Sequence, residues 1–238
     1  MTQGRWTAIR EDLAQDIANG VLQPGARLPN EGELARLYKV GRHSVRRAVA
    51  DLAKEGRVSV EQGRGTFVLP QPKIQYAIGK RTRLRQNLAT QGIDVAGESL
   101  GTEVLPALGP AADALQLCPG EEMSVTRRIT LADGIPVAVG ALFHHLGRFP
   151  EFAERRAAMG SVSDVYRSYG IDDYLRASTD IIARNATAAE AKELRQHPDL
   201  PVMVVRSVDT LTDGTPIAFG EVIWSAERVQ FSIMADQD

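Results

Sequence analysis

The sequence of 238 residues lacks several features that mark whole classes of protein. Its one cysteine, Cys118, allows no intrachain disulfide and fits no cysteine-based zinc site. His144 and His145 are adjacent and would point to opposite sides of a strand, and no histidine pair at i,i+4 suggests a metal site. No apolar run approaches ~18 residues, and no secretory signal is recognisable. We therefore expect a cytoplasmic protein without a metal, another cofactor or a membrane partner.

A large excess of charge is also missing, but the charges are unevenly distributed. The net charge is −2, yet residues 1–72 carry 11 Lys and Arg against 8 Asp and Glu, whereas residues 73–238 carry 17 against 22. The length is typical of one or two domains, and a hydrophobic content of 43% is ample for packed cores. A slightly basic first part followed by an acidic remainder fits a DNA-binding domain joined to a domain that binds something else.

Residues 25–68 contain two short helical patterns followed by a hairpin pattern. Asn30 is a suitable N-cap for the first of these helices. Its expected apolar side consists of Leu34, Leu37 and Val40. The second helix has an apolar stripe at helical spacing, formed by Val45, Ala48, Val49 and Leu52. A preceding helix is predicted from the i, i+4, i+8 spacing of Ile9, Leu13 and Ile17.

The side of the second helix opposite this stripe is basic. It carries His43, Arg46, Arg47 and Lys54, with Arg42 on the flank. A DNA-recognition helix needs this division, because one side packs on its own domain while the other offers donors to bases and phosphates. The alternative interpretation is an ordinary amphipathic helix with a solvated basic side.

The hairpin pattern favours the DNA-binding interpretation. Val58 and Val60 alternate along one strand, and residues 66–68 form the other. The turn between them reads Gln62-Gly63-Arg64-Gly65, where two glycines permit positive φ and a close approach to a phosphate. A basic wing that follows a helix-turn-helix rarely arises by chance.

The order and spacing of these motifs resemble the DNA-binding domain of the GntR family. The match, IANGxLxPGxxLPxExELAxxYxVxRxxVRxAxxxLxxEGxVxxxxGxGTFV, lies within residues 6–69. The resemblance implies a winged helix-turn-helix that binds operator DNA through Arg42, His43, Ser44, Arg46, Gln62, Gly63 and Arg64. Arg47 shares the same basic side of the helix. Two departures are Gly41, where a small hydroxyl residue is usual, and Gly32, where arginine is frequent; Arg36 would partly replace the latter.

A boundary is expected at Pro70-Gln71-Pro72, because two prolines interrupt regular structure and stiffen a short linker. We therefore expect a DNA-binding domain over residues 1–70, a linker over 71–80 and an effector-binding domain over 81–238.

The second domain contains an internal repeat. LADGIPVAVG at 131–140 and LTDGTPIAFG at 211–220 each follow a strand pattern and, further upstream, a short helical pattern at 111–115 or 188–192. Asp-Gly between alternating apolar runs is a strong hairpin signal. We predict an α+β domain in which the two hairpins share one antiparallel sheet with helices on one face. A ligand pocket is expected between the two halves; the alternative is a duplicated scaffold without a ligand.

Several arginines of this domain suggest an anion site. Arg81, Arg83 and Arg85 alternate at its start, and Arg176 lies in a predicted strand. Because Arg127 and Arg128 are adjacent within a strand, one of them must point inward, which is costly unless it meets an anion or a carboxylate. A helix that begins at residues 161–164 with Ser161 and Ser163 offers further donors. Together they predict a site for a phosphate, a phosphonate or a carboxylate; the alternative for each arginine is a surface salt bridge.

Residues 80–232 resemble the UTRA-type effector-binding domain of the HutC subfamily, which has the chorismate-lyase fold. The segments RTRLRQNLATQG, RFPEF, SVSDVY and DYLRASTDIIAR are similar to those of regulators of phosphonate-utilisation operons. The resemblance implies a homodimeric repressor that senses a phosphonate, phosphate or related metabolite and releases an inverted-repeat operator. It places the anion against Leu84, Arg85, Arg128 and Ser161, with Arg83, Ser163 and Arg176 as further candidates.

Two departures from that pattern affect the expected ligand. Leu84-Arg85 stands where Phe-Ser or Phe-Thr is usual, and Gly140 stands where some sugar-phosphate sensors carry an acid. The first departure adds a charge to the site or removes a hydroxyl contact, and the second argues against an amino-sugar phosphate. A HutC-type regulator that senses a carboxylate or a sugar phosphate is the alternative. A lyase-like enzyme is a further alternative, but Ser161 and Ser163 lack a glycine-flanked nucleophile elbow. We expect no catalytic residues.

Overall fold

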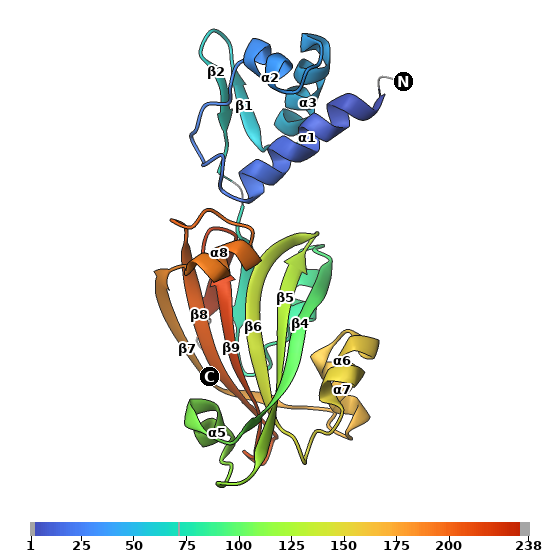
Figure 1. Ribbon diagram of the computed structural model, residues 1–238, viewed down its shortest axis with the longest axis vertical. Helices are drawn as coiled ribbons and strands as arrows, with labels where there is room; N and C mark the ends of the chain where they lie inside the picture. The colour runs from blue at the N-terminus through green and yellow to red at the C-terminus, as the bar shows by residue number, and fades with distance from the viewer. Residues whose placement is uncertain (1–2, 71, 234–238) are drawn as a thin grey trace. The chain divides into compact units, whose positions relative to one another are not determined.

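A computed structural model describes residues 3–70 and 72–233 (Figure 1). It divides the chain into two compact units. The first extends to Lys73 and includes Arg195–His197, and the second comprises the remaining residues from Ile74 onward. The expected linker over 71–80 is therefore too long, because Ile74–Ile78 already form strand β3 of the second unit.

The first unit is a winged helix-turn-helix. Its elements are α1 (Gln3–Ala18), α2 (Glu31–Leu37), α3 (Arg42–Lys54), β1 (Val58–Glu61) and β2 (Gly65–Val68). The two strands form an antiparallel hairpin. The predicted stripes of α1 and α3 are confirmed as buried core.

Two apolar predictions in this unit are wrong. The Leu37 side chain is 68% exposed, because Ala35 and Tyr38 of the same short segment pack against the core instead. Val60 is 62% exposed, whereas Val58 is buried, because the core extends only along the first part of the wing.

The start of α2 follows from its sequence. The Asn30 Oδ1 atom accepts hydrogen bonds from the amides of Gly32 and Glu33, each at 3.0 Å. The Glu33 carboxylate accepts one from the Asn30 amide at 2.7 Å. This capping box satisfies amides that the first turn leaves free. Gly41, at the N-cap of α3, makes no side-chain cap.

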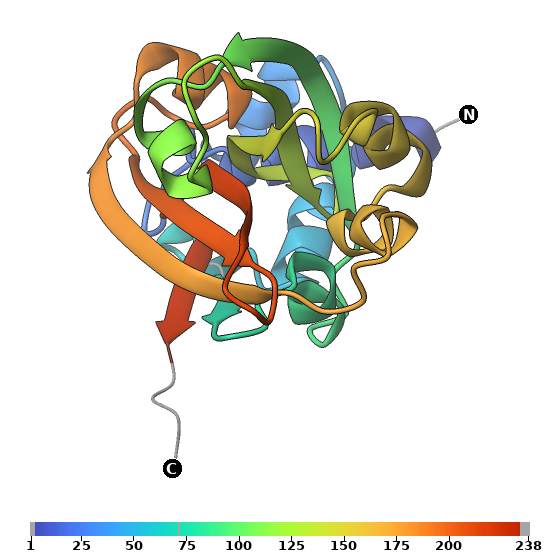
Figure 2. The ribbon, with the colours of Figure 1, turned by 90° about the horizontal axis from the view of Figure 1, so that it is seen from below.

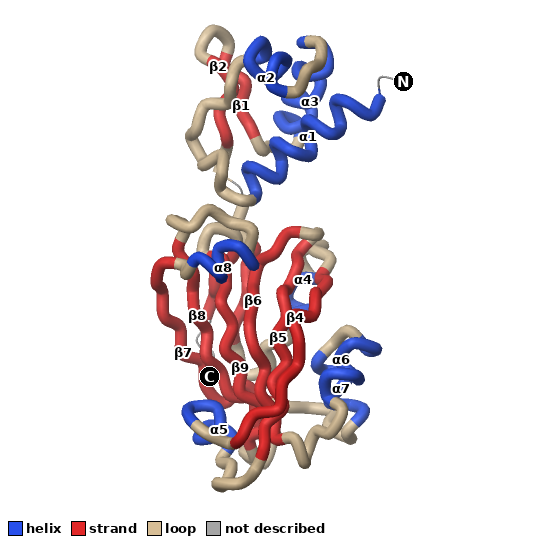
Figure 3. Tube along the Cα trace, viewed as in Figure 1, coloured by secondary structure: helices blue, strands red, loops and turns tan. Residues whose placement is uncertain are grey.

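The second unit is built on a six-stranded antiparallel sheet in the order β4-β5-β6-β9-β8-β7 (Figure 3). The strands of this sheet are β4 (Val95–Pro106), β5 (Glu122–Ala132), β6 (Ile135–His145), β7 (Leu175–Asn185), β8 (Pro201–Thr210) and β9 (Pro216–Ser225). A separate parallel pair consists of β3 and β10 (Val229–Ile233). The helices are α4 (Leu84–Ala89), α5 (Gly109–Leu115), α6 (Phe152–Met159), α7 (Val162–Ser168) and α8 (Ala188–Glu193).

The sequence repeat corresponds to two β-hairpins. One joins β5 to β6 through Asp133 and Gly134, both with positive φ, and the other joins β8 to β9. The two hairpins meet where β6 pairs with β9, so one continuous sheet contains both halves, as predicted.

Helices cover both faces of this sheet (Figure 2), which corrects the expectation of one covered face. Helix α5 packs through Ala111 and Leu115 against Met123 on one face, where the end of α8 also packs. Leu88 of α4 packs in the cluster that contains Ala138 on the other face, where α6 and α7 also pack around His144. The physical reason is that the central strands are apolar on both sides and need two covering layers. No helix among the described residues is long and apolar enough to cross a membrane.

Candidate functional site

The outer side of α3 presents most of the predicted DNA-binding residues. Arg42, His43, Arg46 and Arg47 are exposed and Ser44 is half-buried, whereas the apolar stripe of the helix faces the core. The helix therefore has the two-sided character that DNA recognition requires.

Three arginines, two from α3 and one from α2, lie close to Glu31 and Gly32. Arg46 donates to both Glu31 carboxylate oxygens, at 3.1 and 2.9 Å, and this hydrogen bonding lowers the pKa of Glu31. The Arg42 guanidinium occupies the space beside Gly32, where a Cβ would lie 3.4 Å from its Nη2 atom. Arg36 donates to the Gly32 carbonyl oxygen at 3.4 Å. Arg36 and Arg42 thus lie beside Gly32, the position at which GntR-type domains frequently carry an arginine.

Arg47 has a different environment. Its guanidinium lies 4.2 Å from the centre of the Trp6 ring of α1, a cation–π distance. This contact connects α3 to α1 and still leaves Arg47 exposed.

The wing presents Gln62, Gly63 and Arg64 at its tip, all exposed. Arg64 pairs with Glu61. Gly65 has a φ of +125°, and a Cβ there would lie 2.5 Å from the Nε atom of Arg27. Arg27 is therefore an exposed basic residue beside the wing that sequence reasoning missed, because its place depends on an isolated bridge to Phe67.

The second unit contains a cavity of about 320 Å³. Its walls come from the start of α4, from β4 and β5, and from the α6–α7 segment. Six of the seven predicted effector residues line it: Arg83, Leu84, Arg85, Arg128, Ser161 and Ser163. The cavity lies beside the strands of the first repeat. The prediction of a pocket between the two halves is therefore wrong.

The reason is the close packing where the halves meet. Gly140 of β6 opposes Val222 of β9, and a Cβ at Gly140 would lie 2.6 Å from the Glu221 carbonyl oxygen. Backbones this close leave no room for a ligand. The same contact explains why position 140 carries no acidic side chain in this chain.

Three arginines converge on the cavity. Arg128 donates to the Gly97 carbonyl oxygen at 2.8 Å, and Arg85 donates to the Gly160 carbonyl oxygen at 3.1 Å. Arg156, which sequence reasoning missed, also donates to Gly160. Burial and the nearby charges of Arg128 and Arg85 lower the pKa of Arg156 to about 10. Burial, and then Arg85, lower the pKa of Arg128.

The lining of the cavity is strongly positive. It contains five arginines, because Arg167 also lines it, but only one carboxylate, Asp164. Asp164 already pairs with Arg167 at 2.8 Å. Gly97 makes room for the charge, since a Cβ there would lie 2.8 Å from the Nη2 atom of Arg128. Arg83, Arg128 and Arg156 are half-buried, and Arg85 and Arg167 are exposed. An excess of positive charge in such a partly enclosed space is suited to binding an anion.

Other predicted residues shape the walls. The Arg83 guanidinium donates to the Tyr174 carbonyl oxygen at 2.6 Å and lies 3.3 Å from the centre of its ring. The hydroxyls of Ser163 and Tyr174 are 3.0 Å apart. Ser161 is the N-cap of α7 and accepts from the Asp164 amide. Arg83 therefore fixes Tyr174, while both serines leave hydroxyls at the cavity wall.

Arg176 does not join this group. It pairs with Asp209 at 2.6 Å in the cross-strand register of β7 and β8, and it is not among the cavity residues. Burial raises the pKa of Asp209 despite this arginine. The pair therefore belongs to the sheet and not to the cavity.

The described residues offer neither a metal-binding cluster nor an exposed acid–base histidine at His144. They contain no cluster of three or more His, Cys, Asp or Glu side chains suited to a metal ion. His144 is fully buried, with its Nε2 atom 2.9 Å from the Tyr166 hydroxyl, and burial lowers its pKa to about 3. It is a neutral core histidine far from the exposed position that an acid–base catalyst needs.

The comparisons with known proteins agree with this division. Residues 6–68 match the family described as "Bacterial regulatory proteins, gntR family", and residues 90–230 match the UTRA domain. The chain is 36% identical to the "Uncharacterized HTH-type transcriptional regulator RB1450" of Rhizobium meliloti (strain 1021), over 96% of this chain and 93% of that protein. It is 30% identical to the "Probable transcriptional regulator PhnF" of Escherichia coli (strain K12), over 96% and 94%. The crystal structure of PhnF from Mycobacterium smegmatis shares the fold, with a TM-score of 0.66 at 24% identity over 97% of this chain and 100% of that one.

Proposed function

The chain belongs to the GntR family of bacterial regulatory proteins and carries a UTRA domain, and from this we propose that it represses phosphonate uptake or utilisation genes. A small phosphorus-containing anion would release it from its operator. Members of this family are transcriptional regulators rather than enzymes, in agreement with the expectation of no catalysis.

The observation that carries the effector class is the charge of the cavity. Of the five lining arginines, Arg83 pairs with Asp173 and Arg167 with Asp164. The other three, Arg85, Arg128 and Arg156, favour a ligand with more than one negative charge. A phosphonate or phosphate offers three acceptor oxygens to Arg85, Arg128 and Arg156, whereas a single carboxylate offers two. The volume of about 320 Å³ is in the range of pockets that enclose small ligands.

On the DNA side, the exposed donors of α3 and the wing support binding of duplex DNA. Arg42 and Arg46, with His43 and Ser44, would meet base edges and phosphates in the major groove. Gln62, Gly63 and Arg64 would contact the backbone beside it, and Arg36, Arg47 and Arg27 would add phosphate contacts. A homodimer would place two winged helix-turn-helix units on the two half-sites of an inverted-repeat operator.

Isothermal titration calorimetry of the full chain tests the effector class. The panel contains inorganic phosphate, 2-aminoethylphosphonate, methylphosphonate, urocanate and an amino-sugar phosphate. We expect a simple phosphonate or phosphate to bind and urocanate not to bind. Binding of urocanate alone would favour the carboxylate alternative, and binding of the sugar phosphate alone would favour the sugar-phosphate alternative.

A further inference from the structure

Helix α4 forms one wall of the cavity and also holds the strand that begins the second unit. Its N-cap and first turn, residues 83–86, line the cavity. One turn later, Asn87 and Gln91 turn toward β3. Strand β3 follows the wing after residues 69–73, so it is the first regular element that the chain reaches from the DNA-binding unit.

The contact consists of two side-chain amides that each bind one backbone residue twice. Asn87 accepts from the Ala77 amide at 3.0 Å and donates to the Ala77 carbonyl oxygen at 2.7 Å. Gln91 accepts from the Gln75 amide at 3.0 Å and donates to the Gln75 carbonyl oxygen at 2.6 Å. The Gln91 side chain also donates to the backbone carbonyl oxygen of Asn87 at 3.0 Å, which holds Gln91 against the α4 backbone.

This pattern takes the place of a neighbouring strand. Alternate residues of a strand direct their backbone groups to the same edge, so Gln75 and Ala77 share one edge of β3. The other edge pairs in parallel with β10. Asn87 and Gln91 are four residues apart and lie on one side of the helical segment, at the spacing that matches two positions along the strand. Without them the outer edge of β3 loses these partners.

Apolar packing joins the same two elements. Leu88 of α4 is fully buried, in one cluster with Tyr76 and Ile78 of β3. The Tyr76 ring stacks on Trp224 of β9, with ring centres 4.9 Å apart. Side chains of β3 are therefore fixed in the core, while its backbone is fixed by the amides.

We propose that Asn87 and Gln91 are positioning residues that transmit occupancy of the arginine cavity to β3 and hence to the chain leading to the wing. An anion drawn to Arg85 restrains the first turn of α4, and the amide pair carries that restraint to the backbone of β3. The inference rests on the proposed anion effector, because it needs a ligand at residues 83–86.

The test combines calorimetry with hydrogen–deuterium exchange on the full chain. Inorganic phosphate and 2-aminoethylphosphonate are the probes. The variants are Asn87→Ala/Gln91→Ala and the near-isosteric Asn87→Asp/Gln91→Glu, which keeps the shape but replaces the donors by carboxylate oxygens. Thr90→Ala is the matched control, because its hydroxyl donates to Asn87 O within the same helix and touches no residue of β3 in the described contacts.

In the unmodified chain and in Thr90→Ala, a bound anion should slow exchange of the β3 amides by about fivefold or more, the lower bound of a typical allosteric coupling. Asn87→Ala/Gln91→Ala should bind the anion with unchanged affinity, whereas Asn87→Asp/Gln91→Glu should bind it more weakly because it adds two negative charges to the segment that carries Arg85. Both double variants should lose the ligand-dependent change in exchange. A merely structural role would speed basal exchange but preserve the response to ligand. Retention of that response in both double variants, or loss of anion binding by both, would overturn the inference. If the unmodified chain binds neither anion, calorimetry alone shows that the proposed effector class is wrong, and the inference is wrong with it.

Discussion

Arg156 lies near Arg128 in the cavity wall, and burial together with the charges of Arg128 and Arg85 lowers the pKa of Arg156 to about 10. Two side chains from elements far apart in sequence thus bring like charges into one partly buried space. Such an arrangement costs free energy in the absence of a ligand and is relieved by an anion.

Replacement of Arg128 should separate anion binding from DNA binding. Arg128→Ala should bind phosphate or 2-aminoethylphosphonate ~10–100-fold more weakly, because a charge-assisted hydrogen bond contributes about 1.5–3 kcal/mol. Its operator affinity without ligand should be unchanged. Calorimetry and fluorescence anisotropy measure the two quantities.

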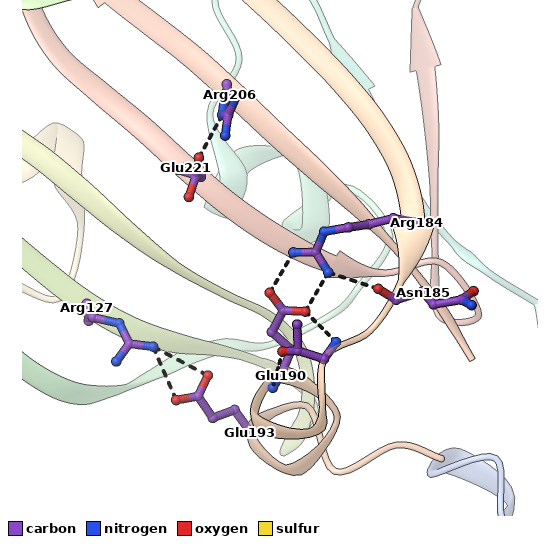
Figure 4. A network of polar contacts seen from close by, with 8 residues as sticks. Arg127, Arg184, Asn185, Glu190, Glu193, Arg206 and Glu221 are labelled. Atoms are coloured by element: carbon purple, nitrogen blue, oxygen red, sulfur yellow. Dashed lines mark hydrogen bonds and ion pairs between the residues drawn. The ribbon is translucent and has the colours of Figure 1, made fainter. Parts of the chain in front are cut away.

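The adjacent residue provides the control for this variant. Arg127 lies on the opposite face of the sheet and pairs with Glu193 of α8 at 3.2 Å (Figure 4). Arg127→Ala should therefore keep the anion affinity of the unmodified protein. Equal anion affinity in Arg128→Ala and Arg127→Ala would remove Arg128 from the effector site.

Replacement of Arg156 should stabilise the ligand-free protein. Because the pKa of Arg156 is lowered in the folded state, its charged form is less favourable there than in the unfolded chain. This destabilisation is fully present at neutral pH and begins to decrease only as the pH rises through about 10 toward the ordinary pKa of arginine. Arg156→Met should raise the melting temperature by about 2–4 °C, the shift that roughly 1 kcal/mol produces at this size. Added phosphate should no longer raise the melting temperature of the Arg156→Met variant.

The neighbouring arginine again serves as the comparison. Arg155 lies over the Tyr169 ring at 4.3 Å and donates to the Ser168 hydroxyl at 3.0 Å. Arg155→Met should lower the melting temperature slightly and keep the stabilisation by phosphate. A lower melting temperature for ligand-free Arg156→Met than for Arg155→Met would contradict the charge argument.

Arg46 should contribute directly to operator affinity. Arg46→Ala should weaken operator binding by about 1–3 kcal/mol and reduce the salt dependence by about one phosphate contact. Arg57→Ala is the control, because Arg57 pairs with Glu55 beyond the end of α3. Fluorescence anisotropy titrations at several salt concentrations measure the operator affinity of both variants. Equal losses of affinity in Arg46→Ala and Arg57→Ala would show that the assignment of α3 as the recognition helix is wrong.

The buried histidine should make the second unit sensitive to acid. The pKa of His144 is lowered to about 3 in the folded state, against about 6.5 in an unfolded chain. Between these values only the unfolded state binds the proton, so stability falls as the pH falls, by about 1.4 kcal/mol per pH unit. His144→Phe should remove this slope in urea unfolding between pH 7 and pH 5. An unchanged slope would assign the acid sensitivity to other groups.

Sequence patterns predicted the parts of this structure that depend on short-range interactions. The N-cap at Asn30, the buried stripe of α3 and the Asp133-Gly134 turn each involve residues within a few positions of one another. Their geometry follows from local hydrogen bonding and helical or strand periodicity.

The errors concern long-range arrangement. Arg156 reaches the cavity because Phe152 of the same helix packs against His144, a contact that no spacing reveals. Arg176 is held by Asp209, a partner set by the register of β7 and β8. Strand β3 pairs with β10 from the far end of the sequence, so its residues resembled a linker. Periodicity along one segment contains no information about which distant segment will pair with it.

The most direct test of the account is release of the protein from its operator. Fluorescence anisotropy follows the full chain bound to DNA from upstream of its own gene, at fixed salt, while 2-aminoethylphosphonate or inorganic phosphate is added. The account predicts that one of these anions lowers operator affinity at least about fivefold, within the usual range of allosteric coupling, and that Arg128→Ala abolishes the effect. Tight operator binding that neither anion changes would contradict it.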